Sequence, residues 1–554
     1  QSLQFAQALL EVRGGPAKAA ELVVDGKLPN FNPRALDQDQ ARQFAQALLG
    51  VRDGSVKVAE WVMADQLSTD RFSELPSELA GELAVAMVSK GSNGIKSLTK
   101  LAEDGQLPQL AFTGNQARQF AKNIIDVKRN PNRQEVAECL TKLVQKNLLP
   151  KEFFAAGRGQ VGQLAVWFLA MAGDGGIESV TKLAKEDLLP KPTFPNDRVG
   201  RLASFLLQTD NGIVCLAELI TNDIISKEAF PKLKIQPSTP TGLLSSVWQY
   251  AGDFIGDLIS GAVPGKASQP ITEVQVSEDI AQKFGAALLK VKNGPAKLAA
   301  LVMDGKLPNF NPKDLNPGQS QQFAQALLGV RGGSVKVAEL VMAGKLPNFN
   351  PKDLNPGQSQ QFAQALLKVK NGPAKLAALV MNDQLSTAEF SKLEADQARQ
   401  FAQVLIKIVP NGIECLATLA QNGQLPLPKL TDKDPIVQSL IDNILNNKTA
   451  NAHIYRNTCA LCLTALASRD LLPPFPSTFD YKKTGQFAAT LIESCGASGT
   501  TCLGVLVEKD LLPGLLLKNV AGNNLQETTR QVKEAVQKAI RGGKTGDLIP
   551  NISR

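Results

Sequence analysis

The sequence has very little histidine and few aromatic residues: one of its 554 residues is His, and 5% are Phe, Trp or Tyr. A single His excludes multi-His metal sites and most Ser/His/Asp catalytic arrangements. The sequence also contains no P-loop, no GxGxxG after a strand, no HExxH and no GxSxG motif. We therefore expect a non-enzymatic protein with no cofactor, no bound metal and no small-molecule substrate.

Long apolar runs are absent as well. No stretch of 18 charge-free apolar residues occurs, so a transmembrane span is not expected. Apolar residues still make up 43% of the chain, enough to bury a large core. The chain begins with Gln1 inside a repeat unit, so loss of a targeting segment by processing stays open.

What the sequence does contain is an internal repeat of 39 residues. The stretch GKLPNFNPKDLNPGQSQQFAQALL occurs verbatim at 305–328 and at 344–367. We call the Phe of QFAQALL, or the residue that takes its place, the ruler residue. Steps of 39 connect Phe5, Phe44 and Leu83, and likewise Phe284, Phe323, Phe362 and Phe401. Degenerate units follow at Phe120, Leu164, Leu202, Leu440 and Phe487, which gives twelve units.

Each unit is expected to form a helical hairpin. In the unit at 316–347, Asn316 caps a first helix, Gly332 and Gly333 break the chain, and Gly344 ends a second helix. Three- and four-residue steps predict one apolar stripe per helix. The predicted stripes are Phe323, Ala326, Leu327 and Val330, then Val335, Ala338, Val341 and Met342.

A larger duplication is superimposed on the repeat. DQLST at 65–69 recurs at 383–387, an offset of 318 residues. Because one hairpin cannot bury both of its faces, neighbouring hairpins must stack. We predict an all-α protein, a right- or left-handed α-solenoid of about twelve hairpins of ~39 residues in two duplicated blocks. The predicted segments are a first block at 1–235, an amphipathic helix and linker at 236–275, a second block at 276–520, and a C-terminal helix and tail at 521–554.

Two repeat families share features with these units. The layout of two helices around RGG, RDG, KNG or PNG resembles TAL-effector-like DNA readers. The FNP…L…A…L rhythm resembles octotricopeptide RNA-binding repeats, although the usual Trp and the aromatic-rich end of those repeats are missing. Both resemblances cover a few positions of each unit, and neither assigns a role to a particular residue.

The seven cysteines permit two interpretations. Cys459, Cys462, Cys495 and Cys502 could form a zinc site, starting from a CxxC pair. The repeat favours a structural role, because most cysteines immediately precede a Leu at one place in the second helix, a small core position. The cysteines that fit this rule are Cys139, Cys215, Cys415, Cys462 and Cys502. Free buried thiols predict a reducing, intracellular compartment, in the cytoplasm or an organelle.

Positive charge is concentrated on the most regular repeats. Residues 284–375 hold twelve basic and four acidic residues, a surplus that equals the net charge of +8 for the whole chain. Two positions of the repeat are regularly basic and flank the Gly-rich turn. The first rung, eight residues after the ruler residue, is Arg13, Arg52, Lys292, Arg331 and Lys370. The second rung, thirteen residues after it, is Lys18, Lys57, Lys297, Lys336 and Lys375.

Stacked hairpins would align both rungs into a basic ladder along which a phosphate backbone could lie. Two degenerate units lack the first rung, where Ala172 and Asp210 stand. Duplication alone would also give the charges their period, so a merely solvated face stays open. Aromatic residues do not interleave with the rungs, which argues against base stacking.

The segment between the blocks carries an amphipathic pattern. Residues 243–263 place Trp248, Phe254, Ile255 and Leu258 on one helical face. A helix docked onto the solenoid is one interpretation, and a partner-docking helix is the other. Taken together, the sequence predicts a binding protein that holds RNA or DNA through the basic ladder, or else an architectural protein–protein scaffold within a larger assembly.

Overall fold

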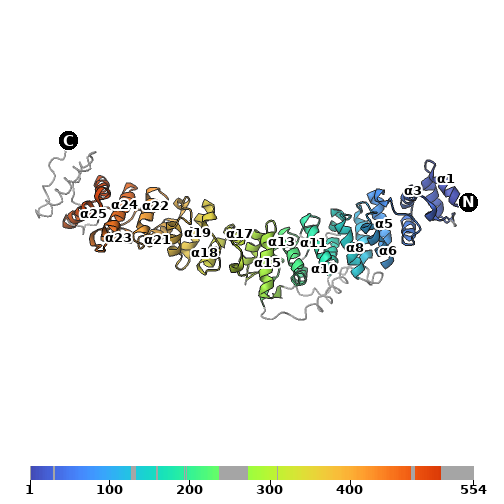
Figure 1. Ribbon diagram of the computed structural model, residues 1–554, viewed down its shortest axis with the longest axis horizontal. Helices are drawn as coiled ribbons and strands as arrows, with labels where there is room; N and C mark the ends of the chain where they lie inside the picture. Colours follow the sequence, from blue (N-terminus) through green and yellow to red (C-terminus); the bar gives the residue numbers. More distant parts are fainter. Residues whose placement is uncertain are drawn as a thin grey trace. The chain divides into compact units, whose positions relative to one another are not determined.

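The computed structural model describes residues 2–28, 31–125, 133–156, 160–191, 194, 196–235, 272–308, 310–475 and 481–512. These residues form a mostly helical protein with 24 α-helices, five short 3-10 segments and one pair of short strands. The chain divides into two compact units, Gln1–Asn311 and Pro312–Arg554. Within each unit the helices follow one another in chain order (Figure 1).

Unit 1 begins with paired helices of about ten residues each. Its helices are α1 (Ser2–Leu10), α2 (Gly15–Val24), α3 (Gln38–Leu49), α4 (Gly54–Met63), α5 (Ser77–Ser89), α6 (Ser92–Glu103), α7 (Gly114–Ile125), α8 (Arg133–Gln145), α9 (Lys151–Ala155), α10 (Gln160–Met171), α11 (Asp174–Lys185), α12 (Asn196–Leu206), α13 (Asp210–Thr221), α15 (Glu278–Lys290) and α16 (Gly294–Met303). The segments between hairpins include the 3-10 turns η1 (Pro33–Ala35) and η2 (Phe72–Glu74).

Unit 2 continues the same alternation. Its helices are α17 (Pro317–Leu328), α18 (Gly333–Met342), α19 (Pro356–Lys368), α20 (Gly372–Met381), α21 (Ala395–Leu405), α22 (Asn411–Gln421), α23 (Pro435–Asn446), α24 (Ala452–Ser468) and α25 (Tyr481–Glu508). Its 3-10 segments are η3 (Pro312–Asp314), η4 (Pro351–Asp353) and η5 (Phe390–Lys392). Gly496 interrupts α25 with φ 55° and ψ −123°, so α25 consists of two helices joined at this turn.

The local signals for the helices of the unit at 316–347 are confirmed. Asn316 accepts a hydrogen bond from the backbone N–H of Gln319, and the Gln319 side chain completes a capping box at the start of α17. Gly332, with φ 77°, separates α17 from α18, and Gly344, with φ 65°, follows the end of α18. Glycine adopts these left-handed conformations without the clash that a Cβ would cause.

The predicted apolar stripes are only partly correct. The buried residues of α17 are Ser320, Phe323, Ala324, Leu327 and Leu328, and those of α18 are Gly333, Val337, Ala338 and Leu340. Ala326, Val330, Val335, Val341 and Met342 are half-buried instead. A helix that packs between two neighbours buries adjacent residues on a wider face, and a single narrow stripe misses part of that face.

The ruler residues lie in the core of their hairpins. Phe44, Phe120, Phe284, Phe323, Phe362, Phe401 and Phe487 are fully buried, as are Leu83, Leu202 and Leu440. Phe5 is the exception among the described side chains, with 51% exposure. The helix that carries Leu164 is described, but the side chain of that residue is not.

Neighbouring hairpins contact each other through both of their helices. In unit 1, α3 contacts α1 and α5, and α4 contacts α2 and α6. In unit 2, α19 contacts α17 and α21, and α20 contacts α18 and α22. First helices therefore pack on first helices and second helices on second helices.

A residue with positive φ follows each second helix. It is a glycine, an aspartate or an asparagine, which are the residues that tolerate this conformation best. The positions are Gly26, Asp65, Gly105, Asn147, Asp187, Asp223, Gly305, Gly344, Asp383, Gly423, Asp470 and Asp510. This residue turns the chain out of the helix toward the next hairpin.

The predicted boundary between the two blocks lies inside unit 1. There the strands β1 (Lys232–Ile235) and β2 (Glu273–Val276) pair in parallel, with Ile235 opposite Val276. Helix α13 packs directly on α15, and Lys283 forms an ion pair with Asp210 at 3.1 Å. The hairpins on the two sides of this boundary therefore contact each other directly within unit 1. Residues 236–271, which include Trp248, Phe254, Ile255 and Leu258, lie outside the described residues, as does the predicted C-terminal helix.

Candidate polyanion-binding surface

The turn between the two helices of a hairpin depends on one glycine. A Cβ on Gly333 would lie 1.8 Å from the carbonyl oxygen of Leu327, and one on Gly372 would lie 1.9 Å from that of Leu366. Nothing but a hydrogen fits there, because real side chains never approach a carbonyl oxygen so closely. The same close approach, within 2.1 Å, occurs at Gly15, Gly54, Gly94, Gly176, Gly212, Gly294, Gly412 and Gly499.

The first rung lies two residues before this glycine. In the five hairpins with a basic first rung, the next residue is left-handed, with φ between 61° and 78°: Gly14, Asp53, Asn293, Gly332 and Asn371. All five first-rung side chains are exposed: Arg13, Arg52, Lys292, Arg331 and Lys370. The Arg52 side chain, which is 97% exposed, contacts the neighbouring Asp53 loosely at 3.8 Å. The other four have no ion pair with any described carboxylate. The first-rung cations are therefore open to solvent.

The second rung is different, because most of its lysines already have carboxylate partners. Lys18 contacts Glu21 at 2.9 Å, and Lys336 contacts Glu339 at 3.6 Å, three residues further along the same helix. The hydrogen bond to Glu21, helped by its charge, raises the pKa of Lys18. Lys57 lies 3.6 Å from Glu60, and its ammonium group lies 5.5 Å from the ring centre of Trp61. In these hairpins the ammonium group of the second-rung lysine is therefore paired with a carboxylate of the same hairpin.

The two remaining second-rung lysines show how the position behaves. Lys297 forms an ion pair with Asp223 of the preceding hairpin, and its side chain is only 22% exposed. Lys375 is exposed and has no such partner among the described residues, because Ala378 stands where Glu21, Glu60 or Glu339 would be. From the sequence we expected equivalent cations on the two rungs. In the structure the first-rung cations are exposed, whereas most second-rung lysines are paired with a carboxylate.

Comparison with the divergent hairpins explains the second rung. Three residues after the turn glycine, where regular hairpins have the second-rung Lys, other hairpins have a small residue: Cys215 after Gly212, Cys502 after Gly499, and Ser179 after Gly176. These small residues are at most 1% exposed. The position therefore lies at the contact between second helices, where a lysine is accommodated by extending its ammonium group to the surface.

The cysteines behave as core residues. Cys139, Cys215, Cys459, Cys462 and Cys502 are buried, whereas Cys415 and Cys495 are half-buried. Burial raises the pKa of the Cys215 and Cys502 thiols to about 12 and that of Cys415 to about 11. Among the residues that the structure describes, no group of three or more His, Cys, Asp or Glu side chains is arranged to hold a metal ion.

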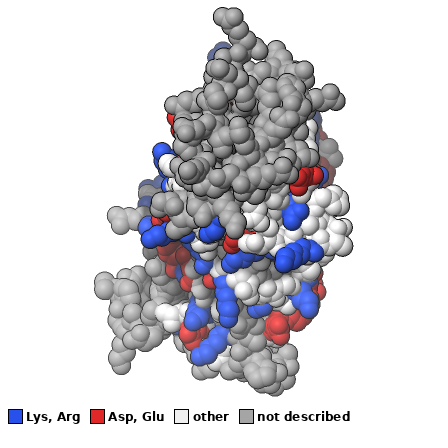
Figure 2. Space-filling view, turned by 90° about the vertical axis from the view of Figure 1, so that its left-hand side faces the viewer, with Lys and Arg blue, Asp and Glu red and all other residues white. Residues whose placement is uncertain are grey.

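Charges of both signs are mixed elsewhere on the surface. Figure 2 shows the left-hand end of the molecule of Figure 1, where Lys and Arg side chains are interspersed with Asp and Glu. Exposed pairs of this kind contribute only about 0–1 kcal/mol each. The first rung differs from this background because its cations recur at one place in the turn without a firm carboxylate partner.

The residue two positions before the ruler residue joins one hairpin to the segment that follows it. The sequence did not predict this role. Gln321 accepts a hydrogen bond from the backbone N–H of Asn350 at 3.1 Å, and Gln360 donates to the carbonyl of Lys392 at 3.1 Å. In three other hairpins the residue is an arginine: Arg42, Arg118 or Arg399. The recurrence of Gln or Arg at this position of the repeat is the sequence feature that could have indicated this role.

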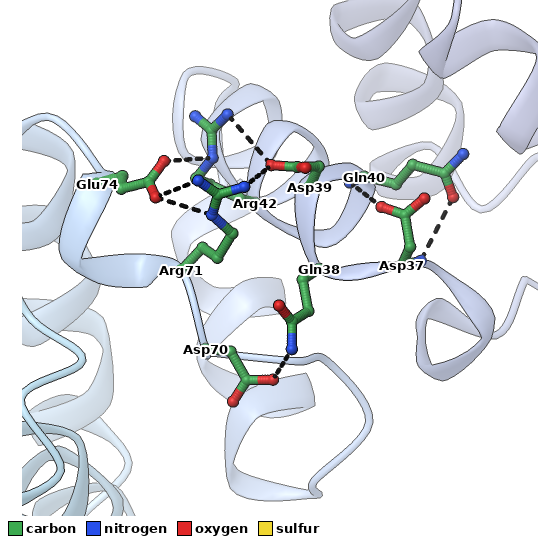
Figure 3. Close-up of polar contacts among 8 residues, drawn as sticks. All are labelled: Asp37, Gln38, Asp39, Gln40, Arg42, Asp70, Arg71 and Glu74. Carbon is green, nitrogen blue, oxygen red and sulfur yellow. Dashed lines mark hydrogen bonds and ion pairs between the residues drawn. The ribbon is translucent and has the colours of Figure 1, made fainter.

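Arg42 belongs to a charged cluster between α3 and the segment that follows α4 (Figure 3). Its Nε lies 3.3 Å from Glu74, and its guanidinium also approaches Asp39. Arg71 contacts both carboxylates, at 2.5 Å to Asp39 and 2.6 Å to Glu74. Two arginines and two carboxylates thus neutralise each other, and this cluster holds hairpins together without offering free charge.

Grooves lie between neighbouring second helices in two places of the described structure. The larger, of about 790 Å³, lies between α20 and α22 and includes Asp383, Glu414 and Cys415 in its lining. The smaller, of about 360 Å³, lies between α11 and α13. Both are open, and neither contains a first-rung cation.

One described helix passes a length and composition test for a membrane span. It is Gln486–Glu508, half of which is buried inside the protein. The break at Gly496 falls inside this stretch and divides it into the two helices of a hairpin. No protein-family model and no curated protein sequence matches this chain.

Proposed function

We propose that this chain is a non-enzymatic α-solenoid that binds the phosphate backbone of RNA or DNA through the first-rung cations. The solenoid is built from about twelve hairpins in two duplicated blocks. The left-handed residue after each second helix, and the contacts between like helices of neighbouring hairpins, support this arrangement. Handedness is not part of the proposal.

The observation that carries the functional proposal is the contrast between the two rungs. First-rung side chains are exposed and lie at a turn whose glycine fixes the backbone. Second-rung lysines are mostly paired with Glu or Asp. A polyanion recruits cations that are not already neutralised, because each contact releases counterions only if the cation is free to replace them.

The proposed contacts are electrostatic and independent of sequence. A lysine or arginine that touches a phosphate positions the strand, whereas contacts to the base edges would be needed to read it. Arg331 and Lys370 belong to consecutive hairpins of unit 2, and Arg13 and Arg52 to consecutive hairpins of unit 1. The binding surface is therefore proposed for the regular hairpins of each unit, and the divergent hairpins, where Ala172 and Asp210 replace the cation, do not contribute.

A second candidate is the architectural scaffold. The ion pairs of the second rung and the neutralised cluster around Arg42 favour it, because they use charge to join hairpins rather than to attract a ligand. A scaffold would bind protein partners within a larger assembly, in a reducing intracellular compartment where its thiols stay free. It does not require exposed cations at the turn.

The test is a binding titration of the full chain with fluorescent single-stranded RNA, duplex DNA and heparin. It is made at about 50 mM and 200 mM salt, because phosphate contacts give a steep salt dependence. The double variant Arg331→Glu/Lys370→Glu reverses two first-rung cations. Its matched control is Lys345→Glu/Lys429→Glu, which changes net charge equally at exposed lysines located after α18 and α22.

We expect salt-sensitive nucleic-acid binding that is weakened in the first-rung variant and retained in the control. Each lost phosphate contact should reduce the slope of log K against log salt by about 0.7 for a single strand. Equal losses in both variants would mean that only net charge matters. Absence of binding at low salt would remove the nucleic-acid function and leave the scaffold.

A further inference from the structure

Glutamine recurs at one exposed position of the first helices, immediately before the ruler residue. We call the exposed glutamines at this position the amide row: Gln4, Gln43, Gln119, Gln322, Gln361, Gln400 and Gln486. None of these side chains has a hydrogen bond or an ion pair with another described residue. Their carboxamides are therefore open to a ligand, each with donors and an acceptor.

The amide row persists in hairpins that have diverged elsewhere. Helix α17 has the sequence PGQSQQFAQALL, whereas α25 begins with YKKTGQFAATLI. The shared Phe is a core residue, but the shared glutamine, Gln486 in α25, is exposed. Where a charged residue takes this position, it has a partner in another hairpin. Lys283 pairs with Asp210 at 3.1 Å, and Glu82 accepts a hydrogen bond from Gln116 at 3.4 Å. The row glutamines differ because they make no such contact.

The neighbouring glutamine of the same helices shows what such a carboxamide binds. Gln282, one residue before the row position on α15, donates to the carbonyl of Asn311 at 2.7 Å and accepts from its N–H at 3.2 Å. Gln321 and Gln360 each hold a chain segment by one main-chain hydrogen bond. Asn350, which Gln321 holds, is extended, with φ −107° and ψ 104°. In this protein a first-helix carboxamide therefore binds an extended main chain.

The first helices that carry Gln322 and Gln361 are almost free of charge. Helix α17 contains no charged residue, and α19 contains only Lys368, at its last position. One turn before the two row glutamines stand Gly318 and Gly357, which are exposed and have no side chain to keep a ligand away. This surface attracts a polyanion weakly and favours a neutral main chain.

The spacing of the amide row matches one form of extended chain. Helix α17 packs on α19 and α19 on α21, so Gln322, Gln361 and Gln400 lie on successive packed helices. The axes of packed helices are about 8–10 Å apart. A polyproline II segment returns to the same orientation every three residues, a rise of about 9.3 Å, and its main-chain groups have no internal hydrogen bonds. Successive row glutamines can thus meet equivalent groups of such a segment.

We propose that the amide row of α17, α19 and α21 is a docking surface for an extended, polyproline II-like segment of a protein partner. Gln322, Gln361 and Gln400 bind the N–H and C=O groups of every third residue, and the side chains of the segment set its identity. The proposal does not rest on the phosphate contacts, because it uses uncharged side chains of the first helices and not the cations of the turn. Either proposal can therefore fail while the other holds.

The test begins with selection of a phage-displayed library of random 12-residue peptides on the full chain. The tightest binders are synthesised and titrated by fluorescence anisotropy against the full chain and two variants. Gln322→Ala/Gln361→Ala removes two carboxamides of the row. The matched control, Gln384→Ala/Gln421→Ala, removes two exposed glutamines located after α20 and at the end of α22. Alanine favours helix, so the helices remain intact, which far-UV circular dichroism checks.

A second measurement examines the main chain of the peptide directly. Each residue of the tightest peptide is N-methylated in turn, which removes one N–H donor and leaves the side chain unchanged. Because a polyproline II segment presents every third residue to the row, the sensitive positions should be three residues apart.

We expect Gln322→Ala/Gln361→Ala to bind the peptide at least about tenfold more weakly, as for the loss of several neutral hydrogen bonds. The control should bind as the unchanged protein does. Failure to select any peptide, equal binding by the two variants, or an N-methylation scan without a three-residue period would overturn the proposal. So would weaker binding of single-stranded RNA in the row variant with unchanged peptide binding, because the row would then contact bases.

Discussion

The regular hairpins of α17 to α20 and the divergent hairpins of α10 to α13 share a turn but not its charge. Both kinds place a glycine against a carbonyl oxygen: Gly333 and Gly372 in the first, Gly176 and Gly212 in the second. Only the regular hairpins carry the first-rung cation. The turn therefore requires the glycine for its close packing, whereas it forms with or without the cation. The cation has no structural role in the turn.

The residue that precedes the second helix shows how the same turn is reached in two ways. In the regular hairpins Gly332 and Asn371 adopt positive φ and make no side-chain cap. Before α13, Thr209 has φ −130° and accepts a hydrogen bond from the Gly212 N–H at 3.0 Å. Because the divergent hairpin uses a conventional helix cap, the close packing at the glycine is the feature common to both.

The largest effect is expected from adding a methyl group at the turn. Gly333→Ala places a Cβ 1.8 Å from the Leu327 oxygen, so the hairpin must open, at a cost of about 4 kcal/mol. Gly329→Ala, in the same hairpin, is the matched control, because its Cβ would lie 3.4 Å from the nearest carbonyl oxygen. Urea unfolding and hydrogen exchange of α17 and α18 measure the difference. Equal stability of the two variants would show that the turn tolerates side chains.

Exchanging the second-rung residues between the two kinds of hairpin tests their different burial. Cys215→Lys places an ammonium group where the side chain is 0% exposed, and should cost about 3 kcal/mol. The reverse exchange, Lys336→Cys, removes only an exposed pair with Glu339 and should cost under about 0.5 kcal/mol. Thermal unfolding of both variants checks this. A mild effect of Cys215→Lys would mean that the lysine reaches solvent in both kinds of hairpin.

The position two before the ruler residue should matter more in hairpins where it is charged. Arg399 contacts Asp434 at 2.5 Å, and the Asp434 side chain is fully buried. Arg399→Ala leaves this carboxylate without its counterion, and should cost about 2 kcal/mol. Gln360→Ala in the regular hairpin loses one exposed hydrogen bond to Lys392, and should cost under about 1 kcal/mol. A reversed order in denaturant titrations would contradict the assignment of Asp434 to the interface.

The smallest effect is expected at high pH, from the thiols that replace lysines. Burial raises the pKa of Cys215 to about 12 and of Cys415 to about 11, above the ordinary value of 9.0. The folded state therefore disfavours the thiolate, so stability is unaffected below pH 9 and declines as the pH rises above 9. At pH 8 a thiol reagent should label Cys415 slowly and Cys215 more slowly. Rapid labelling of Cys215 in the folded protein would show that this position is open.

Much of the fold follows from local rules that the sequence displays. Asn316 and Pro317 mark a helix start, Gly344 marks a helix end, and the 39-residue step places the ruler residue in the core. These signals act within a few residues along the chain, which is why they can be recognised without the structure. The faces of the helices were predicted less well, because a helix with neighbours on two sides buries more than one stripe.

In the candidate site, too, some features could be predicted from the sequence and others depend on packing. The period of the two rungs is a property of the sequence, and so is their position beside the turn. Their different environments depend on residues that are distant in sequence or decided by packing: Asp223 reaches Lys297 across 74 residues, and Cys215 shows that the second-rung position is an interface.

The sequence by itself determined the repeat, the helices, the turn glycines and the concentration of positive charge, because each of these is encoded within a single unit. Only the tertiary structure decided which cations are free and that α13 packs on α15. These features depend on contacts between one unit and the next, and the pattern within a unit cannot specify which of its groups a neighbour will cover.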